Sequence, residues 1–389
     1  MPQKKVEICV GVIMIIKRAL LVTIFILINS SASHALETVG KQAILVDMTT
    51  NTVLFSKNPD KPMTPSSMSK IMTIYKLFEQ LNDGGLSLTD TYKVSEKAWR
   101  KRGSKMFVAL KSRVKIEDLI RGIIVQSGND AAIVVAEGLS GSESTFADSV
   151  NSTAKILGMT NSNFVNASGW PELGHETTAR DLAILTIATI KNFPEFYHYY
   201  NEKTFTYNGI KQRNRNPTIY QNIGADGLKT GHTEAGGYGL TASAVRKDRR
   251  LILVINGLPS KKSRSRESER LLDWGFREFN NYALFEAGQT VTKAKVWMGD
   301  RGSIPLVIRK DLLLTLPRKV RSGMKVTVTM KTPVSAPIEK GAVLATLKIK
   351  IPDREDIELP LISGANVRQL GLFSRLSKAV EYLLWGESE

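Results

Sequence analysis

The chain has 389 residues, of which 42% are hydrophobic, so it can bury a full core and is longer than an average single domain. Lysine and arginine outnumber aspartate and glutamate by 54 to 37, which favours an anionic partner such as nucleic acid, acidic lipid or another anionic polymer. The only cysteine, Cys9, lies near the N-terminus, so a chain that loses this segment has no thiol for a disulfide, for thiolate catalysis or for a zinc–cysteine site.

The N-terminal segment predicts export. In residues 1–35, Lys17 and Arg18 precede an apolar run at 19–29, and small residues prevail at 30–35, which is typical of a signal peptide and its cleavage site. An uncleaved anchor is the alternative, but the run is far shorter than the ~20 residues that cross a bilayer. Export disfavours nucleic acid as the partner. The positive charge then indicates an anionic membrane surface or cell-wall polymer, or simply a solvated basic surface.

Hairpin and helix patterns alternate in the first two thirds of the chain. The segments 42–57 and 237–258 each hold two β-rich runs joined by turn residues, and each predicts a β-hairpin. Between them, apolar residues at helical spacing begin near Thr64 and again at Ile116, where 127–130 interrupts the pattern and predicts two helices joined by a tight turn. Hairpins at both ends of a helical region indicate an antiparallel sheet with helices packed against it, an α+β domain.

Two shorter regions follow. Residues 280–362 hold short runs with period-two alternation between proline and glycine turns, which predicts a small β-sandwich domain. Residues 363–389 predict an amphipathic helix that is too short and polar to span a bilayer but suited to lie on an anionic membrane surface as an anchor. Its apolar stripe comprises Leu372, Phe373, Leu376, Ala379, Val380, Leu383 and Leu384. Docking of this helix on the β domain is the alternative.

A serine and a lysine share one helical turn in the segment TPSSMSKIMTIYK, residues 64–76. Thr64 as a cap and Pro65 at the first helical position predict a helix start. Ser67 then falls in the first turn, where free N–H groups and the helix dipole favour an oxyanion. Lys70 is predicted to lie within hydrogen-bonding range as a base, provided that burial or a nearby positive charge lowers its pKa. This spacing alone is weak evidence.

Two tripeptides accompany this pair. Ser127-Gly128-Asn129 lies in the predicted tight turn, where a hydroxyl can face a cleft and pass a proton. Lys229-Thr230-Gly231 enters the second β-rich region, where a strand edge can pair with an extended peptide. Each tripeptide alone also fits an ordinary turn or strand. Their order along the chain makes the set informative.

Ser-x-x-Lys, Ser-x-Asn and Lys-Thr-Gly in this order are the motif set of class A β-lactamases and penicillin-binding proteins. The chain resembles the low-molecular-mass penicillin-binding proteins of the serine-type D-alanyl-D-alanine carboxypeptidase family, also in the blocks LIRGIIVQSGNDAA and DGLKTGHTEAGGYGL. The resemblance runs from about residue 38 to the C-terminus. It implies a penicillin-binding, β-lactamase-like transpeptidase domain at 36–279, followed by the β domain and the anchoring tail.

The resemblance also implies catalytic roles. Ser67 would form the acyl-enzyme, Lys70 would be the general base, and Ser127 would relay a proton to the leaving D-alanine. Asn129 would hold the cleft. Lys229 would lower the pKa of Lys70 and attract the carboxylate of the substrate.

Substrate-binding residues are implied in the same way. Thr230 would meet the terminal carboxylate, and the N–H of His232 would complete the oxyanion hole with that of the nucleophile. Arg264 would also bind the carboxylate, although a register slip exchanges it with Arg266 and a solvated basic loop is the alternative for this run. Glu172 is predicted to be a surface loop residue, because the chain lacks the Glu-x-x-Leu-Asn arrangement of class A β-lactamases.

The implied function is removal of the terminal D-alanine from peptidoglycan pentapeptides at the periplasmic face of the cytoplasmic membrane, with β-lactams as covalent inhibitors and a role in cell-wall remodelling and cell shape. Neither a cofactor nor a metal is expected. A zinc peptidase is disfavoured because no His-Glu-x-x-His pattern occurs, and an α/β-hydrolase triad is disfavoured because no Gly-x-Ser-x-Gly elbow occurs. Two alternatives stay open: a β-lactamase, and a non-catalytic scaffold that binds the wall.

Overall fold

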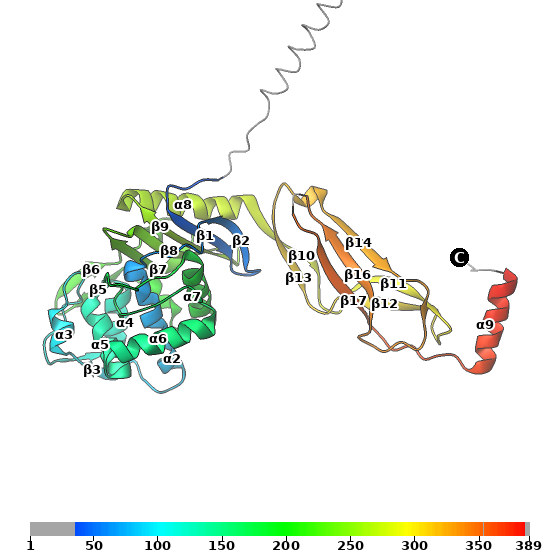
Figure 1. The fold of residues 1–389 in the computed structure, drawn as a ribbon, viewed down its shortest axis with the longest axis horizontal. Helices are drawn as coiled ribbons and strands as arrows, with labels where there is room; N and C mark the ends of the chain where they lie inside the picture. Colours follow the sequence, from blue (N-terminus) through cyan, green and yellow to red (C-terminus); the bar gives the residue numbers. More distant parts are fainter. Residues whose placement is uncertain (1–35, 353, 386–389) are drawn as a thin grey trace, which may run out of the picture. The chain divides into compact units, whose positions relative to one another are not determined.

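The computed structural model describes residues 36–352 and 354–385. The predicted signal peptide lies outside the described residues. The compact unit considered below begins at Gly40, and Figure 1 labels its helices and strands.

An antiparallel five-stranded sheet in the order β2-β1-β9-β8-β7 forms the centre of the N-terminal domain. Its strands are β1 Gln42–Asp47, β2 Thr52–Lys57, β7 Ala225–Thr233, β8 Gly237–Arg246 and β9 Arg249–Leu258. Both predicted hairpins are confirmed, because β1 pairs with β2 and β8 pairs with β9. The pairing of β1 with β9 joins the two ends of this domain in one sheet.

Helices cover both faces of this sheet (Figure 1). On one face, α8 (Lys261–Glu278) packs on β8 and β9, and on the other, α7 (Ala179–Asn192) packs on β1 and β9. Strand β9 is buried along most of its length, as expected for a strand that is covered on both faces. The other helices are α2 Lys70–Asn82, α3 Glu96–Arg100, α4 Ile116–Ile124, α5 Asn129–Ser140 and α6 Glu143–Leu157. Two short hairpins complete the domain: β3 Thr91–Lys93 with β4 Arg113–Lys115, and β5 Thr204–Tyr207 with β6 Ile210–Arg213.

The turn between α4 and α5 confirms the predicted interruption of the helical pattern. Leu119 and Ile123 of α4 and Val134 of α5 are fully buried, so both helices belong to the core. Ser127 in the turn has a φ of 59°, a left-handed conformation that costs free energy in a residue other than glycine. Packing of the two buried helices holds Ser127 in this conformation.

A second apolar core lies in the C-terminal β domain. A six-stranded sheet in the order β14-β16-β17-β12-β11-β15 and a two-stranded sheet of β10 with β13 enclose buried residues such as Ile304, Leu347 and Leu361. The strands are β10 Phe279–Phe285, β11 Thr290–Trp297, β12 Ser303–Val307, β13 Leu312–Pro317, β14 Lys325–Met330, β15 Val334–Ser335, β16 Val343–Lys350 and β17 Ile357–Ser363. The predicted fold class, an α+β domain followed by a small all-β domain, is confirmed.

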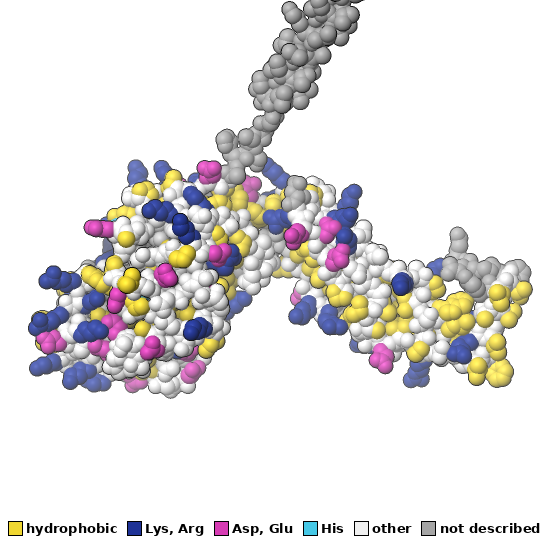
Figure 2. All heavy atoms as spheres, in the orientation of Figure 1, with side chains coloured by type: hydrophobic (Ala, Val, Ile, Leu, Met, Phe, Trp, Pro, Cys, Tyr) yellow, Lys and Arg dark blue, Asp and Glu magenta, His cyan; other side chains and the backbone are white. Residues whose placement is uncertain are grey.

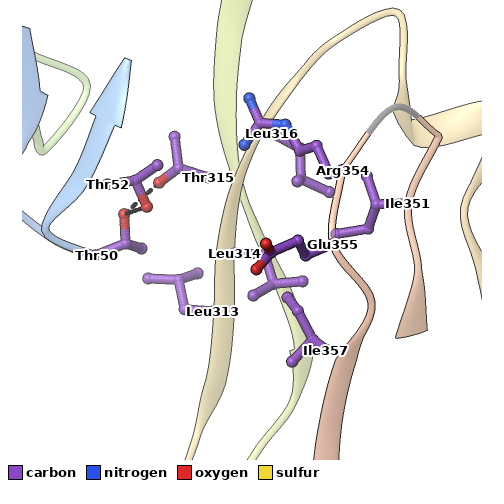
Figure 3. Close-up of a pocket in the computed structure, with 10 residues that line it drawn as sticks. All are labelled: Thr50, Thr52, Leu313, Leu314, Thr315, Leu316, Ile351, Arg354, Glu355 and Ile357. Atoms are coloured by element: carbon purple, nitrogen blue, oxygen red, sulfur yellow. Dashed lines mark hydrogen bonds between the residues drawn. The ribbon is translucent and has the colours of Figure 1, made fainter. Parts of the chain in front are cut away.

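A cavity of about 260 Å³ lies between the turn after β1 and strand β13 (Figure 3). Thr50 and Thr52 line one side, and the hydroxyls of Thr50 and Thr315 are 2.5 Å apart. The rest of the lining is mostly aliphatic, from Leu313, Leu314, Leu316, Ile351 and Ile357, together with Arg354 and Glu355. This lining offers no nucleophile with an adjacent base, so it is not a candidate active site.

The C-terminal segment forms α9, Leu372–Trp385, as the sequence pattern predicts. Several apolar side chains of the predicted stripe are largely exposed, with Phe373 at 90% and Leu383 at 82%. No helix within the described ranges combines the length and the apolar character that crossing a bilayer requires.

A buried ion pair ties the first hairpin to the sheet and to β10. Asp47 Oδ2 accepts a hydrogen bond from Arg249 Nε over 2.6 Å, and the Asp47 side chain is fully buried. The guanidinium also donates to the Phe279 carbonyl over 2.8 Å, and Asp47 Oδ1 accepts from the Thr49 N–H over 2.9 Å. Loss of either side chain would therefore leave the other charge buried without its counter-charge.

We expect Asp47→Ala to lower the free energy of unfolding by about 3–5 kcal/mol, because it leaves a buried guanidinium without its counter-charge. Urea denaturation of the whole chain, followed by tryptophan fluorescence, measures the loss. Asp60→Ala is the matched control: it removes an ion pair with Arg180 whose side chains are 54% and 41% exposed, and such pairs contribute about 0–1 kcal/mol. An equal loss of unfolding free energy in the two variants would contradict the expectation that breaking the buried pair costs more than breaking the exposed pair.

Candidate active site

Ser67 lies in a 3₁₀ turn, Ser66–Ser69, that leads directly into α2. The predicted Thr64 cap is wrong, because Pro65 precedes the turn and no side chain caps it. The first hydrogen bond of the turn runs from the Met68 N–H to the Pro65 carbonyl. The N–H of Ser67 therefore lies ahead of the helical hydrogen bonds, where it can serve an oxyanion.

Lys70 is fully buried beside Ser67. Its Nζ donates to Ser67 Oγ over 3.1 Å, to Asn129 Oδ1 over 2.7 Å and to the Ser168 carbonyl over 2.5 Å. Burial is the main cause that lowers the pKa of Lys70 to about 7, and the positive charge of Arg215 lowers it further. A lysine with this pKa is partly neutral at neutral pH, so it can accept the hydroxyl proton of the serine.

Lys229 and Ser127 form the second pair of the site. Lys229 Nζ donates to Ser127 Oγ over 2.9 Å and to the Thr230 carbonyl over 3.3 Å. Burial, followed by the charge of Lys70, holds the pKa of Lys229 well below its ordinary value. The sequence analysis assigned the lowering of the Lys70 pKa to Lys229, whereas burial and Arg215 are its leading causes.

Asn129, the first residue of α5, joins the lysine to the rim of the site. Its Oδ1 accepts from Lys70, its Nδ2 donates to the Arg102 carbonyl over 2.9 Å, and its N–H donates to the Ser104 carbonyl over 2.7 Å. The same residue thus fixes the position of the buried amine and of the backbone at 102–104.

Two pockets meet at Ser67. The first, of about 450 Å³, is lined by Ser67, Ser104, Ser127, Arg215, Thr230, Gly231, His232, Tyr238, Lys261 and Arg264. The second, of about 640 Å³, is lined by Ser67, Gly103, Ser104, Asn129, Ser168, Gly169, Trp170, Pro171, His232, Thr233, Glu234 and Ala235. The first pocket collects the basic residues, and the second extends along the edge of β7. The structure thus brings together every residue that the sequence analysis predicted for the site.

Arg264, rather than Arg266, faces the first pocket. The alternative of a solvated loop is wrong, because this run forms the first turns of α8. Arg264 is 6% exposed and lies over the Tyr238 ring at 5.8 Å, whereas the Arg266 side chain is 69% exposed. Burial lowers the pKa of Arg264 to about 10.

The sequence analysis missed the supporting role of the loop at 166–176. This loop contacts the turn Ser66–Ser69, which we term the nucleophile turn because it carries the candidate nucleophile. The carbonyl that accepts from the buried lysine belongs to Ser168. Gly169 has a φ of +72°, and a Cβ at this position would lie 1.8 Å from the Ser66 carbonyl oxygen. The Asn166 side chain accepts hydrogen bonds from successive backbone N–H groups of the loop and holds its shape.

His175 supports the nucleophile turn at a further point. Its Nε2 is 2.7 Å from Ser69 Oγ, and its Nδ1 accepts from the Val165 N–H over 3.1 Å. Because Nδ1 accepts, the neutral ring carries its proton on Nε2 and donates to Ser69, whose hydroxyl donates to the Ser66 carbonyl over 2.9 Å. Burial lowers the pKa of His175 to about 4, which keeps the ring neutral. No local pattern could reveal this contact, since 106 positions separate its partners.

Glu172 is exposed, as predicted for a surface loop residue, and its carboxylate accepts from Asn166 Nδ2 over 3.0 Å. Within residues 36–352 and 354–385, no group of three or more histidine, cysteine, aspartate or glutamate side chains is arranged to hold a metal.

The chain matches two protein-family models and is similar in sequence to known enzymes. The family model described as D-alanyl-D-alanine carboxypeptidase matches residues 29–260, more than half of the chain, and the model described as penicillin-binding protein 5, C-terminal domain, matches residues 279–369. The chain is 38% identical over 341 residues to D-alanyl-D-alanine carboxypeptidase DacC of Escherichia coli, with 86% of this chain and 85% of the relative covered.

Solved structures agree with these matches. Penicillin binding protein 5 from Haemophilus influenzae superposes with a TM-score of 0.75 at 35% identity, covering 87% of this chain and 100% of that one. Penicillin-binding protein D2 from Listeria monocytogenes, solved in an ampicillin-bound form, superposes with a TM-score of 0.58 at 28% identity, covering 62% of this chain and 99% of that one.

We expect His175→Asn to slow the acylation of Ser67 by a labelled β-lactam, because asparagine keeps the acceptor near Nδ1 but loses the donor to Ser69. A lost buried hydrogen bond is worth about 1–3 kcal/mol, so the rate should fall on the order of tenfold. His175→Gln reaches the position of Nε2 and should acylate close to the parent rate. Stopped-flow rates and thermal unfolding are measured for all three proteins. Equal acylation rates in the Asn and Gln variants would refute positioning through Ser69.

Proposed function

The chain belongs to the family of serine-type D-alanyl-D-alanine carboxypeptidases, and on this basis we propose that Ser67 is the nucleophile that releases the terminal D-alanine from peptidoglycan pentapeptides. The protein is thus a hydrolase of the penicillin-binding class that acts in remodelling of the bacterial cell wall. One observation carries the assignment of the nucleophile: the fully buried Lys70 amine lies 3.1 Å from Ser67 Oγ.

In the acylation step, neutral Lys70 takes the proton of Ser67 Oγ as the oxygen attacks the carbonyl carbon of the penultimate D-alanine. The N–H groups of Ser67 and His232 stabilise the negative charge on the carbonyl oxygen. The C–N bond to the terminal D-alanine then breaks. Ser127 relays to the leaving amine the proton that Lys70 took from Ser67, so Lys70 is neutral again before deacylation, and the hydrogen bond from Lys229 holds the Ser127 hydroxyl in place.

In the deacylation step, water attacks the ester carbonyl of the acyl-enzyme. Neutral Lys70 accepts a proton from this water and returns it to the Ser67 oxygen as the ester bond breaks. The products are the shortened stem peptide with a new terminal carboxylate and the free serine. Asn129 supports both steps by fixing the amine of Lys70.

The carboxylate of the leaving D-alanine is proposed to bind among Lys229, Thr230 and Arg264. In the described part of the chain, no carboxylate forms a salt bridge with Lys229 or Arg264, and Arg264 Nε is buried without a hydrogen-bond partner. Burial lowers the pKa of both groups. A substrate carboxylate would supply the counter-charge that this pocket lacks, which favours a free C-terminus as the substrate.

β-Lactams are proposed to acylate Ser67 through the same steps, with the strained amide in place of the peptide bond. The ampicillin-bound form of the Listeria relative supports this proposal. In the loop that carries Glu172, the carboxylate is held by Asn166, and nothing in this contact favours rapid hydrolysis of a penicillin.

The parent protein should release D-alanine from a diacyl-Lys-D-Ala-D-Ala peptide, and mass spectrometry should locate a penicillin adduct on Ser67. The acylation rate should rise as the pH passes through about 7, because only the neutral form of Lys70 accepts the proton. Ser67→Ala should show neither reaction, and Ser69→Ala keeps the nucleophile as a control for the adduct site. An adduct on another residue, or a rate that falls as Lys70 loses its proton, would overturn the assignment.

We further propose that α9 anchors the protein peripherally to the periplasmic face of the cytoplasmic membrane. Its large apolar side chains are exposed, from 52% for Val380 to 90% for Phe373, so their burial in a lipid interface is favourable. Lys378 is exposed and Arg375 is half-buried on this helix, and both can meet anionic head groups. The division of the chain at residues 36–279, 280–362 and 363–389 stays a prediction.

Deletion from Leu370 onward should yield an active protein that no longer sediments with vesicles containing phosphatidylglycerol, because it removes the whole apolar stripe. Leu376→Glu in the full chain is a milder test, since a charge at the centre of the stripe should weaken the same binding. Release of D-alanine should be unchanged in both. Persistent vesicle binding after the deletion would contradict anchoring by α9.

A further inference from the structure

A strongly basic surface borders the active site. Eight basic residues in two segments, 101–111 and 203–215, form what we term the basic rim, and neither segment contains an aspartate or glutamate. Three hydrogen bonds join the segments: one from Gln212 Nε2 to the Lys105 carbonyl over 3.0 Å, one from Asn208 Nδ2 to the Phe107 carbonyl over 3.3 Å, and one from Arg215 to Ser104 Oγ. Lys and Arg side chains crowd this edge of the domain, around α3 and the β5–β6 hairpin (Figure 2). The rim comprises Lys101, Arg102, Lys105, Lys111, Lys203, Lys211, Arg213 and Arg215.

The positive charges of the basic rim are not balanced by neighbouring carboxylates. Among the described residues, none of the eight takes part in a salt bridge, while basic residues elsewhere on the domain, such as Arg121, pair with glutamates. The partners of the rim residues are aromatic rings and neutral oxygens instead: Lys101 Nζ lies 4.7 Å from the centre of the Trp170 ring, and Arg213 lies 4.9 Å from that of Tyr220. No direct ion pair therefore neutralises these charges, and they remain available to an anionic partner.

Exposed aromatic side chains accompany these charges. Trp99 is 41% exposed, Phe107 is 46% exposed and Tyr220 is 38% exposed. Large exposed aromatic side chains next to arginine and lysine are typical of binding surfaces, where they add contact area at little entropic cost. The combination favours a partner that carries both negative charge and flat rings or apolar faces.

The basic rim is continuous with the catalytic pockets. Arg215 and Ser104 both line the first pocket, and their side chains are hydrogen-bonded to each other. The Arg102 carbonyl accepts from Asn129, which also holds the catalytic lysine. A polymer whose stem peptide enters the cleft must pass over or beside this surface.

We propose that the basic rim binds the peptidoglycan polymer itself, through the carboxylates of stem peptides adjacent to the one being trimmed and through stacking of sugar rings on the exposed aromatic side chains. This inference rests on the proposed function, which makes the polymer the substrate. Several carboxylates on one polymer strand match several unpaired cations on one surface, so binding is multivalent. The rim raises the local concentration of stem peptides at the cleft and leaves the bond-breaking steps unchanged.

The test compares two triple variants of the full mature chain. Lys111→Glu, Lys203→Glu and Lys211→Glu reverse three exposed charges of the rim, none of which lines either pocket. The matched control, Lys319→Glu, Lys325→Glu and Lys331→Glu, reverses three exposed charges on the β domain and changes the net charge equally. Each protein is sedimented with purified, lipid-free peptidoglycan at low and high salt, and is assayed on the soluble diacyl-Lys-D-Ala-D-Ala peptide.

The rim variant should bind the polymer about tenfold or more weakly at low salt, and high salt should remove most of the difference because it screens exposed charges. The control variant should bind like the parent, and kcat/KM on the soluble peptide should be unchanged in both. Amidation of the carboxylates of the polymer should weaken binding of the parent in the same way. Failure of the proposed function itself is recognised separately, as absence of D-alanine release from the soluble peptide by the parent.

Three results would overturn the proposal. The rim variant could bind peptidoglycan as tightly as the parent, or the control variant could lose as much binding as the rim variant, which would reduce the effect to net charge. Alternatively, the rim variant could retain its affinity for peptidoglycan but lose affinity for vesicles containing phosphatidylglycerol. That last outcome would make the rim a membrane-facing surface.

Discussion

Burial of the Lys70 amine is the constraint on which the arrangement of the site depends. An amine without contact to water is stable only if its hydrogen bonds are satisfied, and three separate parts of the chain supply the acceptors. Ser67 comes from the turn before α2, Asn129 from the start of α5 and Ser168 from the loop before α7. The sheet and its helices bring these parts together, so the pKa of one side chain reflects the packing of the whole domain.

The positive charges around Lys70 serve two purposes. Arg215 lowers the pKa of Lys70 and also lines the first pocket, and Lys229 and Arg264 lie in or beside that pocket. Mutual repulsion of buried cations costs stability in the free protein. An anionic ligand relieves this repulsion. Relief of the repulsion would therefore contribute to the free energy with which the proposed carboxylate binds. The same balance selects against substrates whose terminus is amidated.

Periodic patterns in the sequence predicted most of the architecture. The two hairpins, the break between α4 and α5, the strands of the β domain and the stripe of α9 all follow from spacing of apolar residues and turn residues. The catalytic side chains could be predicted because three short motifs occur in a characteristic order. The prediction of a Thr64 cap was wrong, because Pro65 precedes the turn and no side chain caps it. The run around Arg264, for which a solvated loop was the alternative, begins α8 after the local cap Ser260.

Other parts of the site could not be predicted from the sequence. His175 is far from Ser69 along the chain and lies in none of the three motifs, and Ser69 occupies an unspecified position of the Ser-x-x-Lys motif. The effect of Arg215 on Lys70 depends on a distance in space and on the depth of burial, and one sequence reports neither. Such contacts follow from tertiary structure, so an alanine scan guided only by motifs would overlook them.

The close approach of Gly169 to the Ser66 carbonyl has a consequence for a chain that is still folding. The nucleophile turn and the loop at 166–176 fit together only when no side chain separates them, so the turn has its reactive shape only after the intervening helices have folded. A chain that is still folding then presents an ordinary serine hydroxyl, because no buried lysine with a lowered pKa lies beside it. On the proposed mechanism, reactivity toward an acylating agent therefore requires the completed fold, so covalent labelling of Ser67 measures the fraction of chains that have folded.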